Sequence, residues 1–259
     1  MRTKDSAEKR RTVQRKFIET GCKLIEKNGI GEFTIRNVAK GAGYNSATTY
    51  NYFVNADELK NLCLLRAVEE YFDSMIATLR DNNEKSYIVF LQIWRNYARY
   101  SFLKPDIYQY VFYSKETSNV LGELGKYFSI YPNPNFKKDD PLSQRVLGAS
   151  IAERDTIAFD PVIDDGYVAA SEKRRIMDFS YALELGMAIQ VQVNDYQNIE
   201  QYCRKFIDFL IDFLLDNSTI PESKNEILDK LFWNEKRGFF QSLLSSHYLL
   251  TSTFQSLSS

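Results

Sequence analysis

Histidine is almost absent from the chain. Among 259 residues the only histidine is His247. Because histidine is the usual general base near neutral pH and a common zinc ligand, its scarcity argues against histidine-based catalysis and a His-rich metal site. The sequence also shows no nucleophile elbow, glycine-rich phosphate loop, zinc motif or paired-carboxylate motif. We therefore expect no catalytic residues, no metal, no cofactor and no enzymatic activity.

Cysteine is scarce as well, with Cys22, Cys63 and Cys203 widely separated along the chain. An odd number of isolated cysteines argues against a disulfide framework and fits a reducing cytosol. Together with His247 the three thiols could supply four zinc ligands, but no C-x-x-C pair is present. Cys22 and Cys63 fall on apolar helical faces, which favours buried structural thiols.

The sequence lacks a long hydrophobic run. Its most apolar stretch, residues 206–215, is interrupted by Asp208 and Asp212 and is too short and too charged to span a bilayer. The N-terminal segment carries basic residues at 9–11 with no apolar region after them, which differs from a signal peptide. We therefore expect a cytoplasmic protein with no membrane partner.

Proline and glycine are too few, at 6 and 11 residues, for a collagen-like or low-complexity chain. The hydrophobic share of 44% and charged share of 26% are ordinary for a globular protein. At about 150 residues per domain the length predicts one or two domains. The aromatic share of 14% allows a large core or an apolar cavity.

Charge is unevenly distributed along the chain. Residues 1–43 contain 11 Lys and Arg against 5 Asp and Glu, a net charge of +6, whereas the whole chain has a net charge of −1. A basic segment on an acidic body indicates a polyanionic partner for the first segment. On charge alone, a solvated basic arm is an equally good interpretation.

The first sixty residues show helical periodicity interrupted by a tight turn. The pattern predicts a helix over 9–28, a short helix over 35–40 capped by Thr34, a turn at 41–43, a short helix from Asn45 or Ser46 to about Phe53, and a long helix opened by an Asn55–Glu58 capping box. Two short helices joined by a glycine-containing turn suit a helix-turn-helix. Small side chains at 47–49 would let the second helix enter a major groove about 12 Å wide.

This stretch resembles the TetR family of bacterial transcriptional regulators. The match runs from Phe17 to Leu59 and is carried by an ordered set of residues: Phe17, Gly21, Leu24, Ile25 and Gly29, then 33–39, 42–44, 46–53 and 57–59. The resemblance implies an all-α protein with an N-terminal three-helix helix-turn-helix DNA-binding domain and a larger C-terminal helical bundle for ligand binding and dimerisation. We expect the domains to be residues 1–56 and 57–259, with 222–259 as an additional C-terminal segment.

Family roles carry over to specific positions. Thr34 would cap the second helix and touch a phosphate, and Arg36 could reach a guanine. The expected DNA-binding residues are Thr34, Arg36, Tyr44, Asn45, Ser46, Ala47, Thr48, Tyr50, Asn51 and Tyr52. The sequence departs from the family where Ala47 replaces a common Gly, Thr49 an aliphatic residue and Ala56 a Lys that would contact phosphate. Thr34 and Ser46 could instead be caps alone, and Arg36 a solvated surface residue.

The remaining chain shows further amphipathic segments and no strict alternation typical of strands. Helices are predicted over 84–102, 105–114, 117–130, 142–154, 171–194, 198–217 and 222–245, with loops at 131–141 and 160–166. Because a helical bundle can hold a ligand between its helices, we expect a pocket lined by Trp94, Tyr97, Tyr108 and Phe112. Aromatic residues at helical spacing are also typical of plain core.

The segment 198–217 is apolar nearly all round, and such a helix must be buried on more than one face. By position it corresponds to a family dimerisation helix, so the expected dimer contacts are Phe206, Phe209, Leu210, Phe213 and Leu214. A central core helix in a monomer is the alternative.

The resemblance implies a sequence-specific transcriptional regulator that binds a palindromic operator in double-stranded DNA as a homodimer. We expect a repressor released by a small-molecule effector of unknown identity. An activator and an effector-independent regulator are the alternatives within this class. A helical enzyme and an interaction protein that does not bind DNA are alternatives from other classes.

Overall fold

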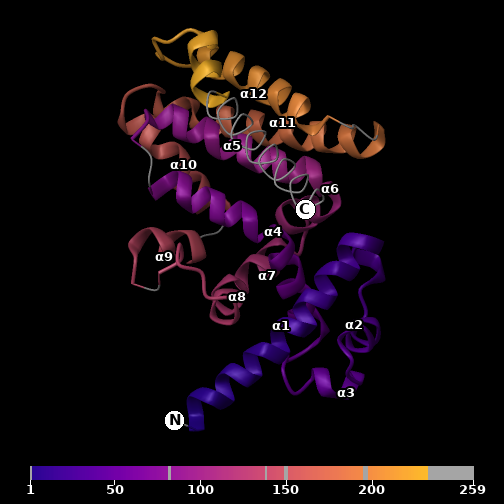
Figure 1. The fold of residues 1–259 in the computed structure, drawn as a ribbon. Coiled ribbons are helices and arrows are strands. Elements are labelled where there is room, and N and C mark those ends of the chain that lie inside the picture. The colour runs from indigo at the N-terminus through magenta and orange to yellow at the C-terminus, as the bar shows by residue number, and fades with distance from the viewer. Residues whose placement is uncertain (1, 81–82, 138, 149–150, 195–197, 233–259) are drawn as a thin grey trace, which may run out of the picture.

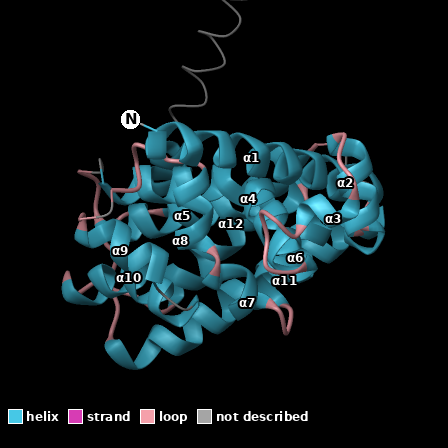
Figure 2. Cartoon of the chain, turned by 90° about the horizontal axis from the view of Figure 1, so that it is seen from below, coloured by secondary structure: helices cyan, strands magenta, loops and turns pink. Residues whose placement is uncertain are grey.

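A computed structural model describes residues 2–80, 83–137, 139–148, 151–194 and 198–232. Over these residues the chain forms helices joined by turns and loops, without a strand, which confirms the predicted all-α class (Figure 2). The helices are α1 (Arg2–Asn28), α2 (Ile35–Ala42), α3 (Ser46–Thr49), α4 (Ala56–Arg80), α5 (Ser86–Leu103), α6 (Pro105–Tyr113), α7 (Thr117–Gly122), α8 (Leu124–Ile130), α9 (Pro141–Gly148), α10 (Ile151–Asp164), α11 (Lys173–Asn194) and α12 (Ile199–Asp216).

Helix α1 connects the two parts of the fold. It packs on α2 at one side and on α4 and α8 along its length, and Figure 1 shows it running below the bundle with α2 and α3 beside it. Gly21 makes the close approach to α4 possible, because a Cβ at this position would lie 2.4 Å from Sγ of Cys63. The larger bundle is built around α5, which packs against α4, α6, α10, α11 and α12.

The bundle core explains why α5 is apolar on nearly every side. Its buried residues include Tyr87, Phe90 and Trp94, which face different neighbours. The ring of Phe90 lies 4.8 Å from that of Phe159 on α10, and Trp94 contacts Tyr181 on α11 at 5.1 Å. Large aromatic side chains at such separations fill the space between helices. None of the described helices combines the length and apolar character needed to cross a membrane.

One helix that the sequence predicted as continuous is interrupted within the described residues. The segment expected over 117–130 divides at Glu123 into α7 and α8, and there the Glu123 amide donates to the carbonyl of Val120 at 3.2 Å. Both short helices pack on α4, so the break lets each bury its own apolar side. The segment expected over 142–154 corresponds to α9 and the start of α10, whose bounds lie on either side of residues 149–150, which are outside the described residues. Periodicity identifies the buried residues but does not detect a change of helix direction.

The loop expected over 160–166 begins later than predicted, because α10 continues through Pro161 to Asp164. Proline removes a helical hydrogen bond and clashes with the preceding turn. Here the neighbouring Phe159 and Val162 are fully buried, and their burial outweighs the local preference. Gly166, with φ of +79°, ends this region. The helix expected over 222–245 is present at 224–232, and its remainder lies outside the described residues together with His247.

Candidate nucleic-acid interface and ligand cavity

Side-chain caps fix the two short helices. Thr34 precedes α2, and its Oγ1 accepts a hydrogen bond from the Asn37 amide at 3.1 Å. Asn45 precedes α3, and its Oδ1 accepts from both the amide and the hydroxyl of Thr48, at 2.8 and 2.9 Å. Gly43 connects the helices with φ of +77°, a conformation that favours glycine. The predicted helix-turn-helix is therefore present, although α3 ends at Thr49 and a turn replaces its expected continuation to Phe53.

The predicted contact residues divide into two groups by exposure. The exposed group can meet a partner directly and comprises Thr34, Arg36, Asn45, Ala47, Tyr50 and Asn51. The half-buried group comprises Tyr44, Ser46, Thr48 and Tyr52. Tyr50 is the most prominent aromatic side chain here, at 57% exposed.

The inner side of this unit is a small aromatic core. Phe17 on α1 stacks on Tyr44 with ring centroids 5.0 Å apart and meets Phe53 edge-on at 5.8 Å. Thr49 is fully buried in the position where an aliphatic residue is expected, and its Oγ1 has no hydrogen-bond partner among the described residues. Tyr44 therefore packs against Phe17 and is also partly exposed on the surface of the unit.

Two residues of α1 form hydrogen bonds with the backbone at the C-terminal end of the helix-turn-helix unit. Neither residue was selected from the sequence. Arg10 donates to the carbonyls of Asn51 and Tyr52 at 2.8 and 3.3 Å. Gln14 donates to the Tyr52 carbonyl at 3.2 Å. Both lie on the helical face of Phe17, at separations of seven and three residues. That spacing was the available signal, but basic residues near an N-terminus are also typical of a solvated arm.

A second set of contacts joins this unit to the bundle. Arg15 donates from Nε to the carbonyl of Ile130 at 2.8 Å. The Tyr131 hydroxyl donates to Oε1 of Glu19 at 3.1 Å. Glu58, at the start of α4, forms an ion pair with Lys126 of α8. One half of the predicted capping box is present, since the Glu58 amide donates to Oδ1 of Asn55 at 2.8 Å.

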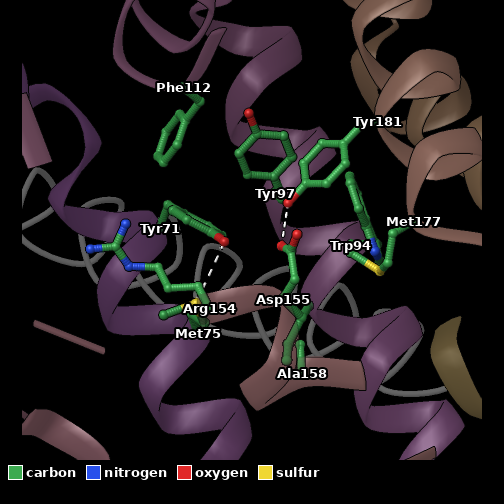
Figure 3. A pocket seen from close by; sticks show the side chains of 11 residues that line it. Tyr71, Met75, Trp94, Tyr97, Phe112, Arg154, Asp155, Ala158, Met177 and Tyr181 are labelled. Atoms are coloured by element: carbon green, nitrogen blue, oxygen red, sulfur yellow. Dashed lines mark hydrogen bonds between the residues drawn. The ribbon is translucent and has the colours of Figure 1, made fainter. Parts of the chain in front are cut away.

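The bundle contains a cavity of about 60 Å³ between α4, α5, α6, α10 and α11 (Figure 3). Its lining is mostly aromatic and sulfur-containing: Tyr71, Met75, Ile93, Trp94, Tyr97, Phe112, Arg154, Asp155, Ala158, Met177 and Tyr181. Three of the four predicted lining residues, Trp94, Tyr97 and Phe112, are therefore in place. Tyr108 lies behind them, with its ring 5.7 Å from Tyr97 and 5.5 Å from Phe112.

Two acidic side chains in this part of the bundle are involved in hydrogen bonds with tyrosines, and one of them, Asp155, lines the cavity. Tyr181 donates a hydrogen bond to Asp155, and burial raises the pKa of Asp155 to about 6. Tyr113 donates to Oε2 of Glu184 at 2.7 Å, and burial raises the pKa of Glu184 to about 7. Arg154 and Asp155 were missed from the sequence because polar residues on a helix normally indicate a solvated face.

The sequence of the helix-turn-helix unit decides the family. Residues 17–61 match the profile of the family described as bacterial regulatory proteins, tetR family. The chain carries a tetR-family domain. This match confirms the resemblance found from the sequence and supports a DNA-binding transcriptional regulator. No curated protein shows significant similarity to the chain.

Several solved structures are similar to this tetR-family chain. RolR in complex with resorcinol is 17% identical, with a TM-score of 0.49 and coverage of 86% of this chain and 95% of RolR. SmeT, the repressor of the Stenotrophomonas maltophilia multidrug efflux pump SmeDEF, is 12% identical, with a TM-score of 0.49 and coverage of 82% and 95%. A TetR family transcription regulator from Marinobacter aquaeolei VT8 is 12% identical, with a TM-score of 0.49 and coverage of 84% and 99%.

The residues expected at a dimer contact are not all accessible. Phe206, Leu210 and Leu214 are fully buried within the protomer, where α12 packs on α5. They cannot touch a partner, because the protomer's own core already covers them. Phe209 is 41% exposed, and Phe213 stacks on Phe179 with ring centroids 3.8 Å apart.

Among the described residues, the cysteines and acidic side chains do not assemble a metal site. Cys22, Cys63 and Cys203 are buried and form no disulfide in this part of the chain, and burial raises the pKa of Cys22 to about 12. Within the described residues no group of three or more His, Cys, Asp or Glu is arranged to hold a metal ion. Buried thiols with raised pKa values are unreactive.

Proposed function

We propose that this tetR-family protein is a cytoplasmic homodimeric repressor that binds a palindromic operator and releases it when a small molecule occupies the bundle cavity. In this proposal residues 1–56 form the DNA-binding domain and residues 57–259 form the effector-binding and dimerisation domain. Helix α4 begins at the boundary between these two domains and also lines the cavity. A movement of this helix would therefore affect both domains.

The distribution of polar and apolar side chains across α2 and α3 carries the proposal. Val38, Ala39, Ala42 and Thr49 are buried beneath the unit, while the predicted contact residues remain exposed or half-buried. The small side chain of Ala47 lets the α3 backbone approach base edges. Arg36 supplies donors that can pair with a guanine, and Tyr50 supplies a hydroxyl for a phosphate.

Release requires a ligand that prefers a conformation with a different spacing between the two recognition helices. The arrangement of α4 supports such coupling. Tyr71 and Met75 line the cavity from this helix, while Glu58 near its first turn binds Lys126 and accepts from the Val54 amide at 2.5 Å. A shift of α4 at the cavity would therefore reach the segment that follows α3.

The test is selection from a random duplex library with the full chain, sequenced after binding at two salt concentrations. The expected result is an enriched palindrome whose half-sites are one helical turn apart, about 34–36 Å. Its affinity should fall as salt rises, because phosphate contacts release counterions. No enrichment at either salt concentration would contradict sequence-specific DNA binding. Enrichment of single half-sites alone would contradict the homodimer.

A further inference from the structure

The bundle cavity contains a buried guanidinium that is only partly satisfied. Arg154 is 8% exposed, and its Nε donates to the carbonyl of Val146 at 3.0 Å. Its Nη1 and Nη2 have no hydrogen-bond partner among the described residues. Removing charged donors from water without an acceptor is strongly unfavourable. These two nitrogens can therefore donate hydrogen bonds to an acceptor that the described part of the chain does not supply.

The neighbouring groups compensate the charge of Arg154 only weakly. Asp155 is the next residue on α10, but Figure 3 shows its carboxylate directed at Tyr181 and Arg154 extending away from it. The guanidinium lies 5.6 Å from the centre of the Phe72 ring, a cation–π contact that supplies no hydrogen-bond acceptor. Burial lowers the pKa of Arg154, yet a guanidinium stays charged at neutral pH.

The rest of the wall suits a flat apolar body. The rings of Tyr71, Trp94, Tyr97, Phe112 and Tyr181 surround the space, and several pairs meet edge-on, including Tyr71 and Phe112 at 5.8 Å. Edge-on aromatic neighbours provide faces and edges against which another ring can pack.

The cavity of about 60 Å³ is smaller than the roughly 150 Å³ of a known cavity that binds benzene. Met75 and Met177 line it. Because methionine has three rotatable bonds and adapts to irregular spaces, these two side chains can move to admit a single ring.

We propose that the effector is a small planar aromatic carboxylate, with its ring among these aromatic side chains and its carboxylate accepting from Nη1 and Nη2 of Arg154. The assignment rests on the proposed function, in which this cavity takes the effector. A planar guanidinium and a carboxylate match each other with two parallel hydrogen bonds. A cationic ligand is disfavoured because Asp155, the acidic residue in the lining, already accepts a hydrogen bond from Tyr181.

The experiment compares benzoate, benzamide and benzamidine, which have nearly the same shape and carry a negative, zero and positive charge. Binding to the full chain is measured by calorimetry without DNA. Benzoate is expected to bind at least tenfold more tightly than either of the others. Arg154→Gln is expected to abolish this preference, and Arg154→Lys to retain part of it. Arg174→Gln is the matched control, because the Arg174 side chain is 92% exposed.

Each outcome bears on the assignment. Equal affinities for benzoate and benzamide, tighter binding of benzamidine, or no binding of any of the three overturns it. A preference that survives in a folded Arg154→Gln, verified by circular dichroism, overturns the role of Arg154. If Arg154→Gln does not fold, an undiminished preference in a folded Arg154→Lys overturns it instead. Because binding is measured without DNA, a positive result combined with no effect of benzoate on operator affinity would reject the proposed release mechanism and leave the carboxylate site intact.

Discussion

Arg36 and Tyr50 are both exposed on the helix-turn-helix, yet their removal should have different consequences. Tyr50→Ala removes a phosphate contact, so we expect weaker binding to all sequences by a similar factor, about tenfold. Arg36→Ala removes a base contact worth about 1–3 kcal/mol of discrimination and should also relax the preference at one operator position. A panel of base-substituted operators measures both effects. Unchanged discrimination in Arg36→Ala would contradict its role in reading a base.

Thr49 is a polar residue in an apolar position, and its replacement should stabilise the protein. Its side chain is fully buried with an unpartnered Oγ1. Valine has nearly the same shape without the hydroxyl, so Thr49→Val should raise the free energy of unfolding by about 1 kcal/mol. Urea denaturation measures the change. Thr48→Val is the control and should give no gain, since the Thr48 hydroxyl donates to Asn45. A less stable Thr49→Val would indicate an acceptor for this hydroxyl.

Glu184 should make stability depend on pH. It is fully buried, and burial raises its pKa from 4.5 to about 7. Between these two values the unfolded chain releases a proton that the folded chain retains. The folded state therefore binds more protons, and the free energy of unfolding falls as pH rises through this window. Asp155, with a pKa of about 6, acts in the same direction.

Glu184→Gln keeps the shape and removes the titration. We expect a flatter stability profile between pH 4.5 and 7, and a gain of about 2 kcal/mol at pH 8. Urea denaturation across the pH series checks both, with the exposed Glu32→Gln as control. An unchanged slope in Glu184→Gln would show that this carboxyl ionises normally.

The roles of individual residues could be predicted where they depend on residues close by in the sequence. Thr34, Asn45 and the Asn55–Glu58 pair act within three residues of the groups that they bind, so local pattern was enough. One detail differed, because the Glu58 carboxylate reaches the amide of Val54 and not that of Asn55. The unpartnered nitrogens of Arg154 were not predictable, because they depend on which helices surround α10.

At the scale of helices, α1 should determine how firmly the end of the recognition unit is held. Arg10 donates to the carbonyls of Asn51 and Tyr52, whereas Arg11 pairs with Glu8 on the same helix. Arg10→Ala and Arg11→Ala each remove one positive charge from α1, so their general electrostatic effects on DNA binding should be similar. Arg10→Ala should weaken operator binding about fivefold more, from the lost anchoring of about 1 kcal/mol. Filter binding on one operator compares them, and equal losses would show that the anchoring does not matter.

The presence of the helices could be predicted from the sequence, but where each helix breaks or continues could not. The apolar residues of α7, α8 and α10 follow helical spacing, so their presence could be inferred. The break at Glu123 and the passage of α10 through Pro161 depend on contacts with α4 and α5, which are distant in sequence. Propensity is a weak prior that tertiary packing overrides. The same reason explains why all five of the selected α12 residues were expected at a dimer contact, whereas Phe206, Leu210 and Leu214 are buried within the protomer.

At the scale of the whole molecule, the described residues leave several large apolar side chains of α11 and α12 exposed. Ile189, Val193 and Phe209 are 44%, 75% and 41% exposed. Large exposed apolar side chains on neighbouring helices are typical of an interface. Since Phe206, Leu210 and Leu214 are covered by the protomer itself, the proposed dimer depends on these exposed residues.

Phe209→Glu should therefore dissociate the dimer while leaving the protomer folded, because it places a charge at an apolar contact without disturbing the internal core. Leu103→Glu is the matched control, as Leu103 is 56% exposed and lies on α5. Sedimentation velocity should show a monomer for Phe209→Glu and a dimer for Leu103→Glu. Operator affinity should fall by roughly 100-fold only in the former, because a monomer loses the advantage of two linked half-sites. A dimeric Phe209→Glu with full operator affinity would place the interface elsewhere, and a monomeric unsubstituted chain at micromolar concentration would exclude a stable homodimer.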